Sequence, residues 1–337
     1  MREVGAPRKR GSGGAVAQSD PHETGIGLLL GIDGDPEPEQ AAAYLAAAVQ
    51  AGSGAAAARL AVLAGLGLGR TQSWSDCLDL LETGARLGDR PAQRQLGVLT
   101  DDPALAVRIR SSGVGGPAVW RRARQAIDMT AWTRLPPSRA LCAAPRIRAI
   151  DGFLSSEVCR WLIHRGDGQL EAAMINDPVT GDARPDPMRT NTVNRFGLAR
   201  IDVVMLLIQA RIAAATGFPM VHMEAPNILS YAPGQEYRPH YDFFNPASPQ
   251  FNSEIDQLGQ RVATFLVYLS EDFSGGETDF PRAGQRHRGR TGDALVFMNV
   301  REDGSPDVES LHAGLPPTRG RKWLLSQWIR ARPQAIS

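Results

Sequence analysis

Residues 231–242 read YAPGQEYRPHYD and place a histidine, His240, two positions before an aspartate, Asp242. Alternate side chains of a β-strand point to the same face, so both residues can project into one barrel. A second histidine, His312, follows 70 residues after Asp242 in the segment SLHAG. Two imidazoles and one carboxylate form the facial ligand triad of non-haem Fe(II), which leaves coordination positions open. The stretch therefore predicts an iron-binding β-barrel.

A lysine, Lys322, lies ten residues after His312 in the segment RKWLLSQWIR. The triad contains no thiolate, and such a ligand set suits Fe(II) better than a structural zinc ion. The chain has only one other lysine, Lys9, among its 37 basic residues. An ammonium is a compact point charge, whereas the guanidinium of arginine is a wide planar fork. We therefore predict that Lys322 supplies the cation for an acidic co-substrate beside the metal.

The pattern of the second half predicts an α+β domain. A helical segment that Ser155 or Ser156 can cap comes first, followed by a second helix over residues 201–216. After Gly217 the sequence becomes a series of short apolar runs separated by GG, PG, DG and PP turn signals. Helices followed by many short strands are typical of a β-sandwich or jelly roll with supporting helices. The strand candidates are residues 225–231, 261–270, 293–300 and 322–330.

Five blocks of sequence follow one another along the chain: Y-x-x-G-Q-x-Y-x-x-H-x-D at 231–242, G-Q-R-V-A-T-F-L-x-Y-L at 259–269, G-G-E-T-x-F-P at 275–281, G-D-A-L-V-F at 292–297 and L-H-A-G-x-P…G-x-K-W…W-I at 311–329. Together these blocks resemble the prolyl 4-hydroxylase-like 2-oxoglutarate/Fe(II) dioxygenases. The resemblance covers roughly residues 145–330 and includes the ten-residue gap between His312 and Lys322. It implies that the second half is a double-stranded β-helix, which is a form of jelly roll.

The resemblance also implies a reaction and a set of site residues. The expected enzyme hydroxylates a C–H bond, with a prolyl residue as the expected substrate. It consumes 2-oxoglutarate and O2, releases succinate and CO2, and uses ascorbate to keep the iron reduced. The carboxylate of Asp242 fills the position that a halide occupies in a halogenase, so hydroxylation is favoured. The implied site comprises three Fe(II) ligands (His240, Asp242, His312), two 2-oxoglutarate contacts (Tyr231, Lys322) and three substrate contacts (Tyr237, Arg261, Trp328).

The first half predicts helices. Residues 40–68 and 74–99 are rich in alanine and leucine, are broken at glycines, and match one another at an offset of 36 residues. A period in the mid-thirties with two helices per unit is typical of an α-solenoid, and this pair resembles the Sel1-like branch of the tetratricopeptide class. We predict a disordered tail over 1–33, a helical region over 34–133, a linker and entry strand over 134–148, and the dioxygenase domain over 149–333.

Composition limits the cellular setting and the partners. A net charge of +1 is no general argument for binding nucleic acid or a membrane surface. No window reaches the roughly 18–20 apolar residues of a membrane span. The three cysteines, Cys77, Cys142 and Cys159, are scattered and odd in number, which favours a reducing compartment over a disulfide framework. We therefore predict a cytoplasmic enzyme that acts on a peptide, a protein or a small molecule.

Two other functions are open at this point. The enzyme can instead hydroxylate a free amino acid or a small natural product, because the fold does not determine the substrate. The long polar segments 168–192 and 243–258 are the expected loops that choose between them. Alternatively, the helical region binds a protein partner and the barrel is inactive, as in an interaction adaptor. The intact triad and Lys322 argue against an adaptor.

Overall fold

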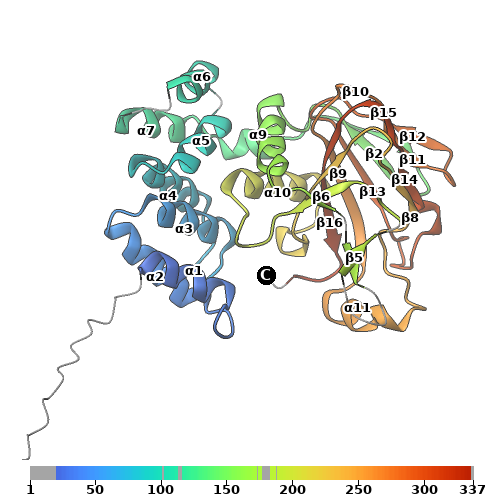
Figure 1. The fold of residues 1–337 in the computed structure, drawn as a ribbon, viewed down its shortest axis with the longest axis horizontal. Helices are drawn as coiled ribbons and strands as arrows, with labels where there is room; N and C mark the ends of the chain where they lie inside the picture. The colour runs from blue at the N-terminus through green and yellow to red at the C-terminus, as the bar shows by residue number, and fades with distance from the viewer. Residues whose placement is uncertain are drawn as a thin grey trace, which may run out of the picture.

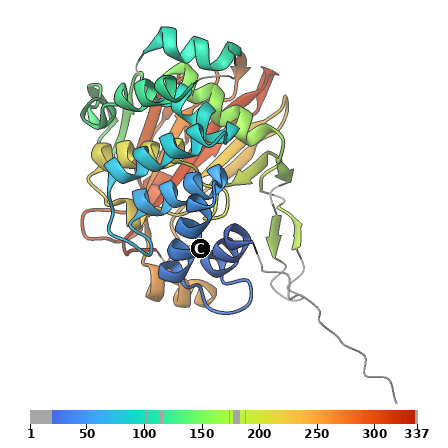
Figure 2. The same ribbon diagram turned by 90° about the vertical axis from the view of Figure 1, so that its left-hand side faces the viewer.

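The computed structural model describes residues 20–100, 102–112, 116–172, 174–176, 183–186 and 188–334. Helices form one side of the molecule and β-sheets the other (Figure 1). Viewed from the helical side, the N-terminal helices stack in front of the sheets (Figure 2). The N-terminal helices are α1 (Pro21–Leu30), α2 (Pro38–Gln50), α3 (Gly54–Leu66), α4 (Trp74–Arg86), α5 (Arg90–Leu99), α6 (Pro103–Ser112), α7 (Pro117–Gln125) and α8 (Met129–Thr133).

The 36-residue spacing seen in the sequence is present in the helices. Helices α2 and α4 begin 36 residues apart, at Pro38 and Trp74, and so do α3 and α5, at Gly54 and Arg90. Side-chain oxygens of Ser53 and Asp89 accept hydrogen bonds from the first turns of α3 and α5. Such caps satisfy backbone N–H groups that a helix leaves unpaired. The helical region thus consists of antiparallel hairpins, while its membership of the Sel1-like class stays a prediction.

Part of the predicted disordered tail is ordered, because residues 21–30 form α1. Asp20 accepts a hydrogen bond from the backbone of His22, and Pro21 occupies the first turn, where its missing N–H costs nothing. Leu29 is buried beside Leu45 of α2. The glycine, serine and basic residues of the preceding tail concealed this helix, which packs on α2 through a tertiary contact. Residues 1–19 lie outside the described part of the chain.

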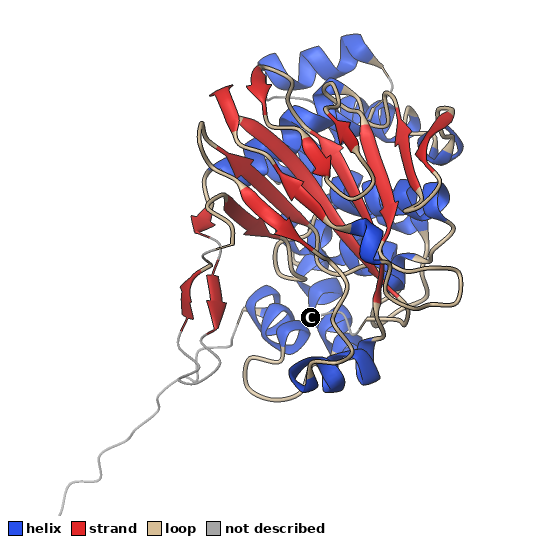
Figure 3. Cartoon of the chain, turned by 90° about the vertical axis from the view of Figure 1, so that its right-hand side faces the viewer, coloured by secondary structure: helices blue, strands red, loops and turns tan. Residues whose placement is uncertain are grey.

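The sheets form a double-stranded β-helix, as the sequence predicted. The large sheet has the order β1-β2-β13-β9-β16-β7-β6-β3 and the small sheet the order β12-β11-β14-β8. From β7 to β16 the chain passes repeatedly from one sheet to the other, which gives the jelly-roll architecture (Figure 3). The large-sheet strands are Ser138–Cys142, Ile147–Ile150, Glu171–Ala172, Thr192–Arg195, Asn227–Tyr231, Arg261–Tyr268, Ala294–Met298 and Lys322–Arg330 (β1, β2, β3, β6, β7, β9, β13, β16).

Shorter elements complete the domain. The small-sheet strands are β8 (Tyr237–His240), β11 (Thr278–Phe280), β12 (Gln285–His287) and β14 (His312–Gly314). Two further pairs are β4 (Met174–Asn176) with β5 (Ala183–Pro185), and β10 (Phe273–Gly275) with β15 (Pro317–Gly320). Segment 243–258, expected as a loop, contains the short helices η2 (Pro249–Phe251) and α11 (Asn252–Leu258). The other helices are α9 (Ser156–Asp167), α10 (Val203–Thr216), η1 (Met220–His222) and η3 (Val308–Ser310).

Helix α10 lies between the helical region and the large sheet (Figure 1). Its apolar residues are buried around most of its circumference, as expected for a helix with neighbours on opposite sides. Gly65 of α3 allows a close approach, since a Cβ there would lie 2.9 Å from Leu206. Toward the sheet, Gln209 of α10 donates to Gln327 of β16. One hydrophobic core therefore runs from α3 through α10 to the sheet.

The guanidinium of Arg59 on α3 also joins the two parts. It donates to the carbonyl oxygens of Leu198, Ala199 and Ile201, in the turn before α10. Burial lowers the pKa of Arg59 from its usual value, but the carbonyl groups satisfy its donors. No helix among the described residues has both the length and the apolar composition needed to cross a bilayer.

Replacing Arg59 with alanine is expected to lower the free energy of unfolding of the whole chain by about 1.5–3 kcal/mol, the range for hydrogen bonds to a charged group. Denaturant melts would measure this change. Because the core is shared, the helical and β-sheet signals should shift together. Arg94→Ala, an exposed change on α5, is the control. Loss of only the helical signal would contradict a single cooperative core.

Candidate metal centre and co-substrate pocket

Three predicted ligands converge inside the barrel. His240 ends β8, Asp242 follows it, and His312 begins β14, which pairs with β8 at His240. The Nε2 atom of His240 lies 3.6 Å from Oδ1 of Asp242, and the Nε2 atom of His312 lies 3.5 Å from Oδ2. The three ligand atoms lie within 4.8 Å of one another, close enough to share one metal ion.

Backbone contacts orient both imidazoles. The Nδ1 atom of His240 lies 2.8 Å from the carbonyl oxygen of Arg238, and that of His312 lies 3.0 Å from the carbonyl oxygen of Ser310. A carbonyl can only accept, so Nδ1 carries the proton and the lone pair of Nε2 faces the cluster. Burial, with the nearby charge of His240, lowers the pKa of His312 to about 4 and keeps this imidazole neutral.

Asp242 is a buried carboxylate in a polar network. Thr264 of β9 donates to its Oδ2 at 2.6 Å, and Asn299 donates in turn to the hydroxyl of Thr264 at 3.0 Å. Burial would raise the pKa of Asp242, but positive charge on His312 and His240 in their protonated forms and the hydrogen bond from Thr264 lower this pKa below its usual range. The carboxylate is therefore ionised, and two nitrogens and one anionic oxygen fit Fe(II).

Lys322 is a fully buried cation without a partner. Its exposed fraction is 0%, and its Nζ makes no hydrogen bond with any described residue. Nζ lies 5.0 Å from the ring centroid of Tyr231, the residue opposite it on β7. The alternate β16 residues Leu324, Ser326 and Trp328 line the cavity beside the triad, so Lys322 shares their face. An unpaired buried ammonium is costly, and an anion is the ligand that this site fits.

A family model described as the 2OG-Fe(II) oxygenase superfamily matches residues 226–330, which contain the triad and Lys322. "Probable prolyl 4-hydroxylase 3" of Arabidopsis thaliana is 33% identical over 239 residues, covering 65% of this chain and 76% of that protein. The chain belongs to the prolyl 4-hydroxylase-like 2OG-Fe(II) oxygenases. Fe(II), 2-oxoglutarate and O2 are therefore the cofactor and co-substrates of this oxygenase.

Other similar proteins are also named prolyl hydroxylases. "Probable prolyl 4-hydroxylase 7" of Arabidopsis thaliana is 34% identical over 206 residues, covering 56% of this chain and 63% of that protein. A solved structure of the viral collagen prolyl hydroxylase from Paramecium Bursaria Chlorella virus-1, in complex with 2-oxoglutarate, is 28% identical. It covers 57% of this chain and 99% of its own, with a TM-score of 0.44.

The predicted substrate residues lie in two adjoining cavities. Tyr237 stacks on His240 with ring centroids 3.4 Å apart, and it lines the small cavity at the triad. Trp328 lines both this cavity and a neighbouring one of about 250 Å³. Arg261 lines only the neighbouring cavity, where its guanidinium lies 3.8 Å from the Trp328 ring centroid. Two hydrogen bonds of 2.7 and 2.8 Å join Arg261 to Glu224.

Sequence reasoning missed several residues of the site. Thr264 and Asn299 orient Asp242, Glu224 holds Arg261, and Arg189 lies over the Tyr237 ring at 5.3 Å. Thr264 lies within one of the five recognised blocks. It also shares a strand face with Leu266, and that alternation could have indicated that its side chain points into the barrel. The other three come from segments without a motif. Only the fold brings them to the metal centre.

The hydroxyl of Thr264 offers a test of this network. Thr264→Val keeps the shape of the side chain but removes the donor to Asp242. We expect Fe(II) affinity to fall about 10- to 100-fold, the usual cost of losing a group that orients a metal ligand. Fe(II) is titrated into the apoenzyme, and the amount of succinate released at each Fe(II) concentration gives the affinity. Thr318→Val, an exposed change on β15, should leave it unchanged; an unchanged affinity in Thr264→Val would remove Thr264 from this role.

The affinity for 2-oxoglutarate should depend on pH through Lys322. Burial lowers the pKa of this lysine to about 7 in the unliganded oxygenase. A carboxylate binds the protonated form, so affinity is greatest below this pKa and falls as pH rises through it. The loss should approach about tenfold per pH unit, with uptake of a proton on binding. Anaerobic calorimetric titrations in buffers of different ionisation heat would show the uptake; a flat affinity above the pKa would contradict it.

Proposed function

We propose that this oxygenase hydroxylates prolyl residues within peptides or proteins. The observation that carries the proposal is the open cavity of about 250 Å³ beside the triad, which Arg261 and Trp328 line. The ring of Trp328, set among charged side chains such as Arg189 and Glu224, suits a proline ring that is flanked by peptide groups. The relatives named prolyl 4-hydroxylases support the same substrate.

We assign each role to a residue of this chain. His240, Asp242 and His312 would hold Fe(II), and the ammonium of Lys322 would pair with the distal carboxylate of 2-oxoglutarate. Burial raises the pKa of Tyr231, so its hydroxyl stays protonated and can donate to the same co-substrate. When bound, Fe(II) and 2-oxoglutarate supply the O2 activation needed to oxidise an unactivated C–H bond. Tyr237, Arg261 and Trp328 would position the substrate.

The balanced reaction converts the substrate C–H, 2-oxoglutarate and O2 into the alcohol, succinate and CO2. A mass-spectrometric screen with Fe(II) and 2-oxoglutarate can test proline-containing peptides and free amino acids in parallel. We expect peptides to gain one oxygen atom in proportion to succinate release. Oxygen gain in free amino acids but in no peptide would overturn the proposal in favour of a small-molecule hydroxylase. If the protein neither releases succinate nor binds 2-oxoglutarate, the alternative function as an interaction adaptor is favoured.

The cellular setting is also proposed. The three cysteines are free in the structure, which supports a reducing, cytoplasmic compartment. Ascorbate is the proposed reductant of the iron, by resemblance to the family. A protein ligand at the helical region is proposed as well.

A further inference from the structure

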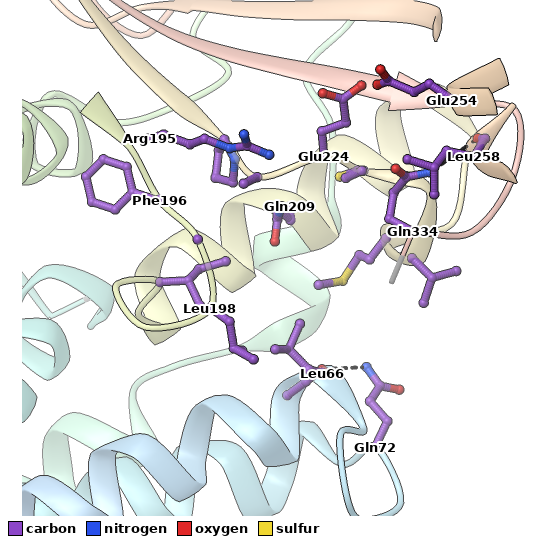
Figure 4. Close-up of a pocket in the computed structure, with 18 residues that line it drawn as sticks. Leu66, Gln72, Arg195, Phe196, Leu198, Gln209, Glu224, Glu254, Leu258 and Gln334 are labelled. Carbon is purple, nitrogen blue, oxygen red and sulfur yellow. Dashed lines mark hydrogen bonds between the residues drawn. The ribbon is translucent and has the colours of Figure 1, made fainter. Parts of the chain in front are cut away.

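A cavity away from the metal lies between the helical region and the barrel (Figure 4). Its volume of about 570 Å³ falls within the usual range of ligand sites. We call it the distal cavity. Leu66 and Gln72 contribute the helical side, and Gln209 and Glu224 the barrel side. Leu258 of α11 contributes another wall.

Shared side chains connect the distal cavity with the metal centre. Arg189 and Trp328 line both the triad cavity and the cavity beside it. Arg195 and Glu224 line both that second cavity and the distal cavity. The three cavities are therefore neighbours in a row, from the triad to α3. A row of this kind fits a long ligand better than a compact one.

The polar groups of the distal cavity suit a polypeptide backbone. The amide nitrogens of Gln72, Gln209 and Gln334 donate to Gly65, Gln327 and Arg332 respectively. None of the three side-chain oxygens accepts a hydrogen bond from another described residue. Each oxygen can accept a peptide N–H. Apolar side chains, including Leu66 and Leu258, line the same cavity and can pack on a substrate side chain.

We propose that the distal cavity binds a segment of the polypeptide substrate that flanks the hydroxylated residue. The helical region is then part of the substrate-binding site, and the oxygenase prefers long polypeptides carrying an apolar residue at a distance from the acceptor. This inference rests on the proposed function, because it needs a polypeptide substrate.

The test compares two lengths of one proline-containing peptide on the full chain with Fe(II) and 2-oxoglutarate. A peptide of about 15 residues spans about 50 Å when extended, which is long enough to run from the metal centre into the distal cavity. A peptide of about three residues spans about 10 Å and cannot reach that cavity while its proline lies at the metal. Leu66→Trp fills the distal cavity from the helical side. Val221→Trp fills the same cavity from a second position. The side chain of Val221 lines the cavity and is 45% exposed, so the fold tolerates a larger residue there. Leu87→Trp, an exposed change on the helical region outside this cavity, is the matched control.

We expect the wild type to favour the long peptide at least about tenfold in kcat/KM, and both cavity variants to lose this preference through a raised KM. Turnover of the short peptide should persist in them, and Leu87→Trp should behave as the wild type. Equal kcat/KM for the two lengths in the wild type, or a preference that both cavity variants retain, overturns the inference while the proposed function stands. If no proline-containing peptide of either length releases succinate, the proposed function itself fails, and the inference with it.

Discussion

Asp242→Ala is expected to abolish iron-dependent turnover. The carboxylate is the only anionic oxygen of the cluster among the described residues, and it lies within 3.6 Å of both imidazoles. Removing a group that merely orients a ligand costs about 10- to 100-fold, so losing the ligand itself should cost more than about 100-fold. Succinate release and Fe(II) binding should fall together. His240→Ala should have the same effect.

The control for this change is an exposed carboxylate. Asp303→Ala alters a surface turn and should leave both Fe(II) binding and turnover unchanged. A melting curve separates a lost metal site from a lost fold, because Asp242 also accepts a buried hydrogen bond from Thr264. Retained hydroxylation in folded Asp242→Ala protein would contradict the assignment of Asp242 as a metal ligand.

Lys322→Met is expected to have opposite effects on co-substrate binding and on stability. One charge-assisted pair contributes about 1.5–3 kcal/mol, so the Kd of 2-oxoglutarate should rise about 10- to 150-fold. Without 2-oxoglutarate, however, the buried ammonium has no partner. A methionine of similar length should therefore raise the free energy of unfolding of the ligand-free enzyme by about 1–3 kcal/mol.

Lys322→Arg tests the shape of the cation. A planar guanidinium keeps the charge but does not fit a site enclosed by Tyr231, Tyr268 and Phe273, so we expect weaker 2-oxoglutarate binding here too. Arg319→Met on the exposed strand β15 is the control for charge loss. If Lys322→Met destabilised the ligand-free enzyme and left the Kd unchanged, the lysine would be a structural residue.

The barrel was predictable because its signals are local. Residues 261–270 and 322–330 are strand-forming runs between turns, and they became β9 and β16. The closeness of His240 and Asp242 followed from their spacing at the end of β8, whereas His312 reaches them only through the pairing of β14 with β8. Helix α1 was missed because its stability depends on the contact between Leu29 and Leu45. No local pattern in a glycine-containing segment reports such a contact.

The surroundings of the triad could not be predicted in the same way. Arg261 was expected to face the substrate, and it lines the cavity beside the triad, but its guanidinium is already paired with Glu224. Glu224 lies 37 residues earlier, in a segment without a motif. Likewise, the contact of Arg59 with the turn before α10 joins segments about 140 residues apart. Pairings of this kind follow from the completed fold.

The buried circumference of α10 limits how this enzyme can be divided. A fragment that starts after the helical region would keep α10 but lose α3 and α5, and would expose the apolar side that now contacts Gly65. Exposed apolar surface of that size favours aggregation. The catalytic half is therefore not an interchangeable module: recombination or expression of it alone would first require new polar residues on α10.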